Sequence, residues 1–191
     1  MLIAFVILGV VIVIVGVAWT LMARQRNDAW KQFATELGAE FVDGGLFRGS
    51  KVLIKVKENT VTLDTYTLPA GDSNTTYTRL RASLPDQKDL QFTLQRRNWV
   101  AKLDKALGTK EINIGDPEFD HDFVIRGEDP AAVQAVFSNR RIYPLLQAQK
   151  SLVLGVRTNE LRLDEYGVIK DVERLKSMLE LFRLMLEQLK G

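Results

Sequence analysis

The chain has 191 residues, of which 46% are hydrophobic and 26% are charged, and it contains no cysteine. Its 26 basic and 24 acidic residues nearly balance, so the composition lacks the basic excess that is typical of a nucleic-acid-binding protein. The lack of cysteine excludes disulfides, thiolate metal ligands and thiol nucleophiles.

An apolar run without a single charged residue occupies residues 2–22. As a helix, a run of this length would span about 31 Å, which matches a hydrocarbon core of about 30 Å. Trp19 near its end and the basic residues in 24–31 are typical of a membrane–water interface. We therefore expect residues 1–23 to form a transmembrane helix with a short N-terminus, and the lipid bilayer to be its partner.

A cleaved signal peptide is the alternative interpretation of this run. It would need basic residues before a shorter apolar stretch, whereas no Lys or Arg precedes residue 2, although Gly16-Val17-Ala18 is an acceptable cleavage triplet. Because the basic flank follows the run, the positive-inside rule predicts a single-pass protein of the plasma membrane whose domain is cytoplasmic.

A short juxtamembrane linker helix is predicted in residues 24–38. Apolar residues recur there at helical spacing before Gly38, a typical C-cap: Trp30, Phe33, Ala34 and Leu37. This stripe would pack either on headgroups or on the core of the domain that follows.

The remaining residues, 39–191, predict one α+β domain. Period-2 runs rich in Val, Ile, Thr and Tyr predict an antiparallel meander or sandwich-like sheet, with strands at residues 39–47, 51–57, 60–68, 75–84 and 90–96. Further strands are expected at 111–114 and 119–126, and a hairpin at 152–157 and 160–166. Short helices are expected at 99–107, 130–137 and 140–149.

A long amphipathic helix is predicted at the C-terminal end, in residues 171–190. Its apolar stripe is wider than the seam of a two-stranded coiled coil, since Leu181 and Leu184 flank the line of Leu175, Phe182 and Leu189. We therefore expect this helix to pack across the sheet of its own domain.

The densest group of acidic side chains lies in residues 115–130, around the single histidine, His121. In a strand, His121 would face away from Asp120 and Asp122, so these three could not share one cation. Asp120 and Asp122 are then candidate ligands only for Ca²⁺ or Mg²⁺, which prefer oxygen. The alternative is that Asp116 and Asp120 bind local backbone while His121 packs in a partly buried row.

Other sequence patterns give little support for catalysis. Any serine triad would have to use His121, and neither GxSxG nor SxxK accompanies it. The glycines of residues 44–51 resemble a phosphate loop, but Ser50 and Lys51 are in the wrong order and a strand follows, so a turn is expected. The same region supplies a basic strip that is a candidate for binding anionic lipid headgroups: Arg48, Lys51, Lys55 and Lys57.

One motif carries a resemblance to a known group of proteins. The FDxxFxIxGxDP pattern comprises Phe119, Asp120, Phe123, Ile125, Gly127, Asp129 and Pro130. With it, the chain resembles uncharacterised bacterial single-pass membrane proteins that pair an N-terminal transmembrane helix with a β-rich cytoplasmic domain. The resemblance implies this layout, but neither a reaction nor functional residues.

The function expected from these observations is a membrane-anchored binding or scaffold module without catalysis or cofactor, acting on an unknown protein partner. An oxygen-ligand metal-dependent enzyme that uses the 116–129 acidic cluster is one alternative, and an anionic-lipid-binding domain is another. Gly9, Gly16 and Thr20 make a small-residue helix face that suits a homodimer, although glycines are also tolerated in lipid without one.

Overall fold

The structure is a computed structural model that describes residues 2–45, 49–70, 73–85, 90–98 and 110–189, without most side chains of residues 2–22. The predicted helix at 99–107 and the lipid-binding candidate Arg48 lie outside the described residues. The elements are α1 (Leu2–Leu37), β1 (Glu40–Val42), β2 (Lys51–Val56), β3 (Asn59–Ala70), β4 (Ser73–Ser83), β5 (Phe92–Arg96), β6 (Glu111–Ile112), α2 (Pro117–Asp122), β7 (Phe123–Gly127), α3 (Pro130–Val136), α4 (Ile142–Ala148), β8 (Leu152–Arg157), β9 (Glu160–Tyr166) and α5 (Val172–Gln188).

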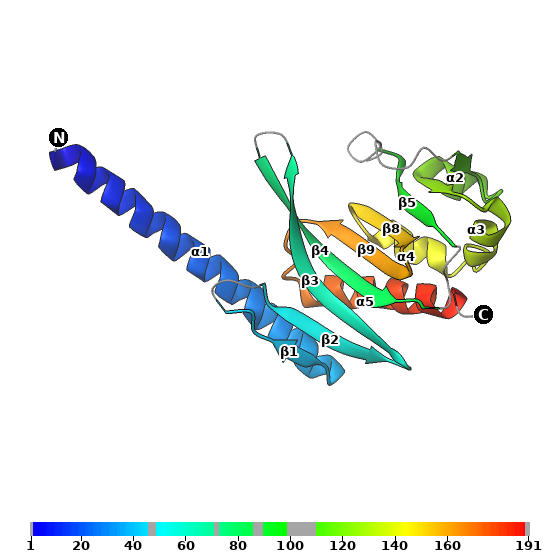
Figure 1. Cartoon of the computed structure of the whole chain (residues 1–191), viewed down its shortest axis with the longest axis horizontal. Helices are drawn as coiled ribbons and strands as arrows, with labels where there is room; N and C mark the ends of the chain where they lie inside the picture. The colour runs from blue at the N-terminus through cyan, green and yellow to red at the C-terminus, as the bar shows by residue number, and fades with distance from the viewer. Residues whose placement is uncertain (1, 46–48, 71–72, 86–89, 99–109, 190–191) are drawn as a thin grey trace.

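The described strands form one antiparallel sheet in the order β1-β2-β3-β4-β9-β8-β5-β7-β6. The α+β class and the antiparallel pairing are confirmed, and the meander is correct from β1 to β4. β5 does not continue it, because the β8–β9 hairpin lies between β4 and β5. The sheet is open and is covered by helices, so the sandwich-like alternative is wrong (Figure 1).

The β8–β9 hairpin has the predicted boundaries. Its two-residue turn, Thr158-Asn159, has positive φ at both residues, of 47° and 61°. This is the backbone of a type I′ turn, which matches the twist of paired strands and which asparagine tolerates better than most residues.

The inner face of the sheet carries the core, and α5 crosses it (Figure 1). Leu63, Leu80 and Leu163 lie side by side in register on β3, β4 and β9, and each is at most 1% exposed. α5 begins at its N-cap Asp171, whose carboxylate accepts from the Arg174 amide, and its Phe182 is fully buried. The prediction that this helix packs on its own domain is therefore confirmed.

Helix α1 is continuous from Leu2 to Leu37 and extends far from the sheet (Figure 1). Trp30, Phe33 and Ala34 near its C-terminal end are buried in the domain core. Gly38, with φ of +62°, ends the helix: the Ala39 amide donates to the Ala34 carbonyl at 2.8 Å. This is a Schellman arrangement, which requires the left-handed backbone that glycine adopts easily.

Among the residues that the structure describes, no helix is both long and apolar enough to cross a membrane.

The strand predicted at residues 119–126 is wrong in its first half, where the chain forms α2. The Asp116 side chain accepts from the amides of Glu118 and Phe119, and Pro117 occupies the first turn. An N-cap aspartate followed by proline starts a helix more strongly than the alternation of Phe119 and His121 favours a strand. β7 then begins at Phe123.

Candidate functional site

The outer face of the sheet, opposite α5, carries a band of charged and aromatic side chains on β3, β4 and β9. Side chains alternate along a strand, so the neighbours of the buried leucines point outward. Asp64 is paired in register with Arg79, and Arg79 with Asp164. The outer-face band consists of Asp64, Tyr66, Tyr77, Arg79, Arg81, Glu160, Arg162, Asp164 and Tyr166.

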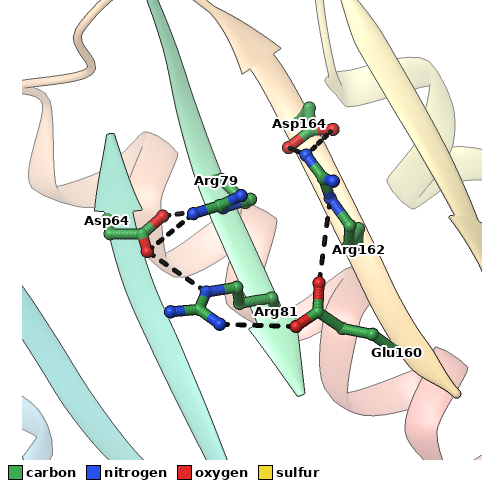
Figure 2. Close-up of polar contacts among 6 residues, drawn as sticks. All are labelled: Asp64, Arg79, Arg81, Glu160, Arg162 and Asp164. Carbon is green, nitrogen blue, oxygen red and sulfur yellow. Dashed lines mark hydrogen bonds and ion pairs between the residues drawn. The ribbon is translucent and has the colours of Figure 1, made fainter. Parts of the chain in front are cut away.

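Asp64 is the centre of one half of the ion-pair network in this band (Figure 2). The Arg79 guanidinium binds it through two hydrogen bonds, of 2.8 and 2.9 Å, and Arg81 Nε adds a third of 3.1 Å. Asp64 and Arg79 have side-chain exposures of only 16% and 18%, so this bidentate pair is partly shielded from solvent.

The other half of the network centres on Arg162 of β9 (Figure 2). Its guanidinium lies 3.2 Å from the Asp164 carboxylate and 4.0 Å from Glu160, and Glu160 also pairs with Arg81 at 3.4 Å. Glu160 therefore joins the two halves across β4 and β9. Three arginines face three carboxylates, so these six residues carry no formal net charge.

Three tyrosines extend the band toward the end of the sheet where β3 turns into β4. Tyr66 stacks on Tyr77 with ring centroids 5.3 Å apart, and Tyr77 meets Tyr166 edge-on at 6.0 Å. The Arg79 and Arg162 guanidiniums lie 4.8 and 5.2 Å from the Tyr66 ring centre. Both distances suit cation–π attraction, which connects the aromatic row to the ion pairs.

Burial shifts the titration of two groups at this junction. It raises the pKa of Asp164, which is 7% exposed, while the nearby Arg162 guanidinium acts in the opposite direction. Burial also raises the pKa of Tyr66, and the Asp164 carboxylate adds to that effect. The Tyr66 phenol therefore stays protonated at neutral pH and donates a hydrogen bond to Asp164.

The candidate metal ligands Asp120 and Asp122 lie on α2 but bind different partners. Asp120 accepts from the amides of Ile114 and Gly115 at 3.0 and 3.1 Å, which confirms the alternative that this side chain binds local backbone. Asp122 accepts from the Tyr143 hydroxyl and the Gln147 amide, both at 3.1 Å.

Three other residues of the acidic segment cap helices or are exposed to solvent. Asp116 caps α2 and Asp129 caps α3, while His121 is exposed rather than packed in a partly buried row. In the part of the chain that the structure describes, no three His, Asp or Glu side chains are grouped so that they could hold a metal ion.

The described lysines of the basic strip are exposed along β2 and the turn after it. Lys55 donates to the Thr60 hydroxyl at 2.8 Å, and Lys57 pairs with Glu187 at 3.1 Å. Lys55 and Lys57 lie by the β2–β3 turn, at the opposite end of β3 from its turn into β4.

A shallow pocket of about 470 Å³ lies beside β6 and α3. Some of its polar groups already have partners: Gln134 donates to the Asn113 carbonyl at 2.8 Å, and Glu111 pairs with Arg97 at 2.7 Å. The lining residues are Lys110, Glu111, Ile112, Asn113, Gly127, Glu128, Pro130 and Gln134.

Comparison with known proteins gives one structural likeness. The chain is similar to the crystal structure of the mycobacterial trehalose monomycolate transport factor A, TtfA, with a TM-score of 0.57. The identity is 12%, and the match covers 87% of this chain and 93% of that chain. At this identity the likeness shows a shared fold. No protein-family model and no curated protein matches the sequence.

The outer-face band is not among the sites predicted from the sequence. A signal was present in three predicted strands, each of which has two polar or aromatic residues spaced two apart and therefore on one face. These pairs are Asp64 and Tyr66, Arg79 and Arg81, and Arg162 and Asp164. Nothing local in the sequence indicates that β4 pairs with β9, about 80 residues later, and only that pairing brings the three segments together.

Proposed function

We propose that this protein is a non-catalytic binding or scaffold module, anchored in the plasma membrane by residues 2–22 with its domain in the cytoplasm. The outer-face band is its binding surface for a protein partner. The observation that carries the proposal is the composition of that band, because tyrosine and arginine dominate the residues that contribute most to binding at protein interfaces.

Two features of the band support protein recognition over binding of a small anion. Its arginines are each paired with a carboxylate, so the surface presents directional hydrogen bonds and aromatic area rather than net positive charge. Tyr166 is 51% exposed at its edge, so it offers an amphipathic side chain to a partner.

The anchor is supported by the charge-free sequence of residues 2–22 and by the described side chains of that segment. Ile7, Val10, Val11 and Ile14 are between 48% and 61% exposed on the part of α1 that extends from the domain (Figure 1). Exposed apolar residues of this size are costly in water and favourable in lipid. The likeness to a crystal structure titled as a transport factor is compatible with an accessory role.

The test is site-specific photo-crosslinking of the full-length protein in its native membrane. A photoreactive residue at Arg81 lies in the outer-face band, and one at Arg183 lies on the exposed side of α5 as the matched control. We expect Arg81 to give a discrete protein adduct that disappears when Tyr66→Ala is added, and Arg183 to give none.

Equal adducts from both positions, or no adduct from Arg81, would contradict the proposal. The enzyme alternative is tested separately with the purified full-length protein in detergent. Turnover of any substrate in a hydrolase and transferase panel that is lost on His121→Ala would also contradict it.

A further inference from the structure

Exposed large apolar side chains occur in two places in the described part of the chain. One is the N-terminal part of α1, and the other is the end of the sheet where β3 turns into β4 and β9 ends. At this second place Leu68 is 41% exposed, Tyr166 51% and Val168 37%.

Polarity changes in steps along the β3–β4 hairpin toward this end. The Asp64–Arg79 ion pair comes first, and the stacked Tyr66 and Tyr77 follow. The exposed Leu68, paired in register with Thr75, comes last. This order of charged, aromatic and apolar residues is the one found where a protein surface enters a membrane interface.

Three hydrogen bonds fix this end of the sheet relative to α1. The Trp30 indole donates to the Ile169 carbonyl at 2.9 Å, and the Ile169 amide donates to the Thr78 hydroxyl, also at 2.9 Å. Lys170 donates to the Gln25 side chain at 3.1 Å. The β9–α5 loop therefore connects β4 at Thr78 to α1 between Gln25 and Trp30.

Trp30 and Thr78 are joined through Ile169 and so lie at one level of the molecule. From this level, α1 and the β3–β4 hairpin extend toward the same end of the molecule (Figure 1). Eight residues of helix, from Trp30 to Met22, rise about 12 Å. Three residues of strand, from Thr78 to Thr75, cover about 10 Å. Leu68, which is paired with Thr75, therefore lies within one helical turn of the level at which the charge-free segment of α1 ends.

We propose that this end of the sheet is a second contact with the lipid surface, resting on the proposed membrane anchor. Leu68 and Val168 enter the boundary between headgroups and acyl chains, while the outer-face band beside them stays outside the lipid and accessible to its protein partner. The occupant is a lipid surface because α1, if it crosses the bilayer, places the membrane boundary at this level. Peripheral contacts of this kind add to an anchor through buried apolar area.

The test uses the natural absence of cysteine, which allows a single nitroxide label to be placed in the full-length protein. Separate variants carry Leu68→Cys, Ile14→Cys and Arg157→Cys, each spin-labelled and reconstituted into vesicles of phosphatidylcholine and phosphatidylglycerol. Ile14 reports on the anchor, and Arg157, beside the turn at the far end of β8 and β9, is the aqueous control. The measurement is the accessibility of each label to oxygen and to a water-soluble nickel chelate.

We expect the label at Leu68 to be several-fold less accessible to the nickel chelate than the label at Arg157, with its oxygen accessibility retained. A label at Leu68 as aqueous as that at Arg157, beside an immersed label at Ile14, overturns this inference and leaves the anchor intact. An aqueous label at Ile14 overturns the anchor itself. Protection of Leu68 from both reagents, in detergent as well as in vesicles, indicates a contact with a second protein copy and also overturns the inference.

Discussion

The indole Nε1 of Trp30 donates a 2.9 Å hydrogen bond to the backbone carbonyl of Ile169, 139 residues later in the chain. Both residues are buried, and Ile169 lies between the last strand and α5. The bond therefore joins the end of the long N-terminal helix to the C-terminal part of the fold. It makes α1 part of the core from Trp30 onward rather than a separate linker.

Replacing Trp30 should show the separate contributions of this bond and of the ring. Trp30→Phe keeps most of the apolar surface but leaves the Ile169 carbonyl without its buried donor, which should cost about 1–3 kcal/mol. Trp30→Ala also leaves a cavity and should cost about 3–5 kcal/mol. Denaturant unfolding of the chain from Ala23 onward measures both, and equal losses in the two variants would contradict this division.

Phe182 is fully buried under the sheet, so Phe182→Ala should lower the free energy of unfolding by about 3–5 kcal/mol. The loss should not depend on protein concentration, because the burial is within one chain. The control is Arg183→Ala, which changes the next, exposed residue and should alter stability by about 0.5 kcal/mol or less. Thermal melts of both proteins at several concentrations test this. A wild-type melting temperature that rises with concentration, together with a variant that melts like the wild type at low concentration and lacks this rise, would indicate a dimer contact instead.

Glu165 is fully buried on the inner face and accepts hydrogen bonds from Ser151 and Arg174. Arg174→Met should cost about 3–5 kcal/mol, because it leaves a buried carboxylate without its cation. Adding Glu165→Gln removes that charge and should recover part of the loss. A double variant no more stable than Arg174→Met alone would show that packing, rather than charge, is the main contribution of Arg174.

Hydrogen bonds from Gln147 and Tyr143 hold the pKa of Asp122 below its ordinary value of 3.8. The folded state therefore binds this proton less tightly than the unfolded state, so the contribution to stability is present above about pH 4 and is lost as the pH falls through the lowered pKa. The stability difference between the wild type and Asp122→Asn should be constant from about pH 7 to 5 and should shrink in more acidic solution. Unfolding curves across this range measure it, with Tyr143→Phe expected to weaken the pH dependence; a difference that grows in acid would reverse the assigned sign.

Local signals in the sequence were sufficient for most elements of the fold. The Thr158-Asn159 turn, the Gly38 helix end and the Asp129-Pro130 helix start depend on the backbone preferences of a few neighbouring residues. Asp116-Pro117 is the same signal as Asp129-Pro130, but the alternation from Phe119 to Ile125 favoured a strand over it. Phe119 and Phe123 are also four residues apart, which is helical spacing.

The sheet order and the outer-face band could not be predicted in the same way. Insertion of the β8–β9 hairpin between β4 and β5 depends on contacts between segments far apart in the chain, and alternation alone does not distinguish one partner strand from another. The position of Arg79 and Asp64 on the outer face follows from the period-2 alternation of a strand, but the proximity of Arg162 and Glu160 to the β3–β4 ion pairs does not.

α1 is one unbroken helix from Leu2 to the buried Trp30 and beyond. The direction that its N-terminal part faces is therefore fixed relative to the domain. One residue inserted near position 23 would turn everything before it by about 100° about the helix axis and move it by about 1.5 Å. Seven inserted residues would nearly restore the original facing and add about 10 Å of length. The number of residues between the N-terminal segment and Trp30 therefore sets two properties in different ways. The distance of the segment from the sheet increases with every added residue, whereas the direction that it faces repeats after whole helical turns.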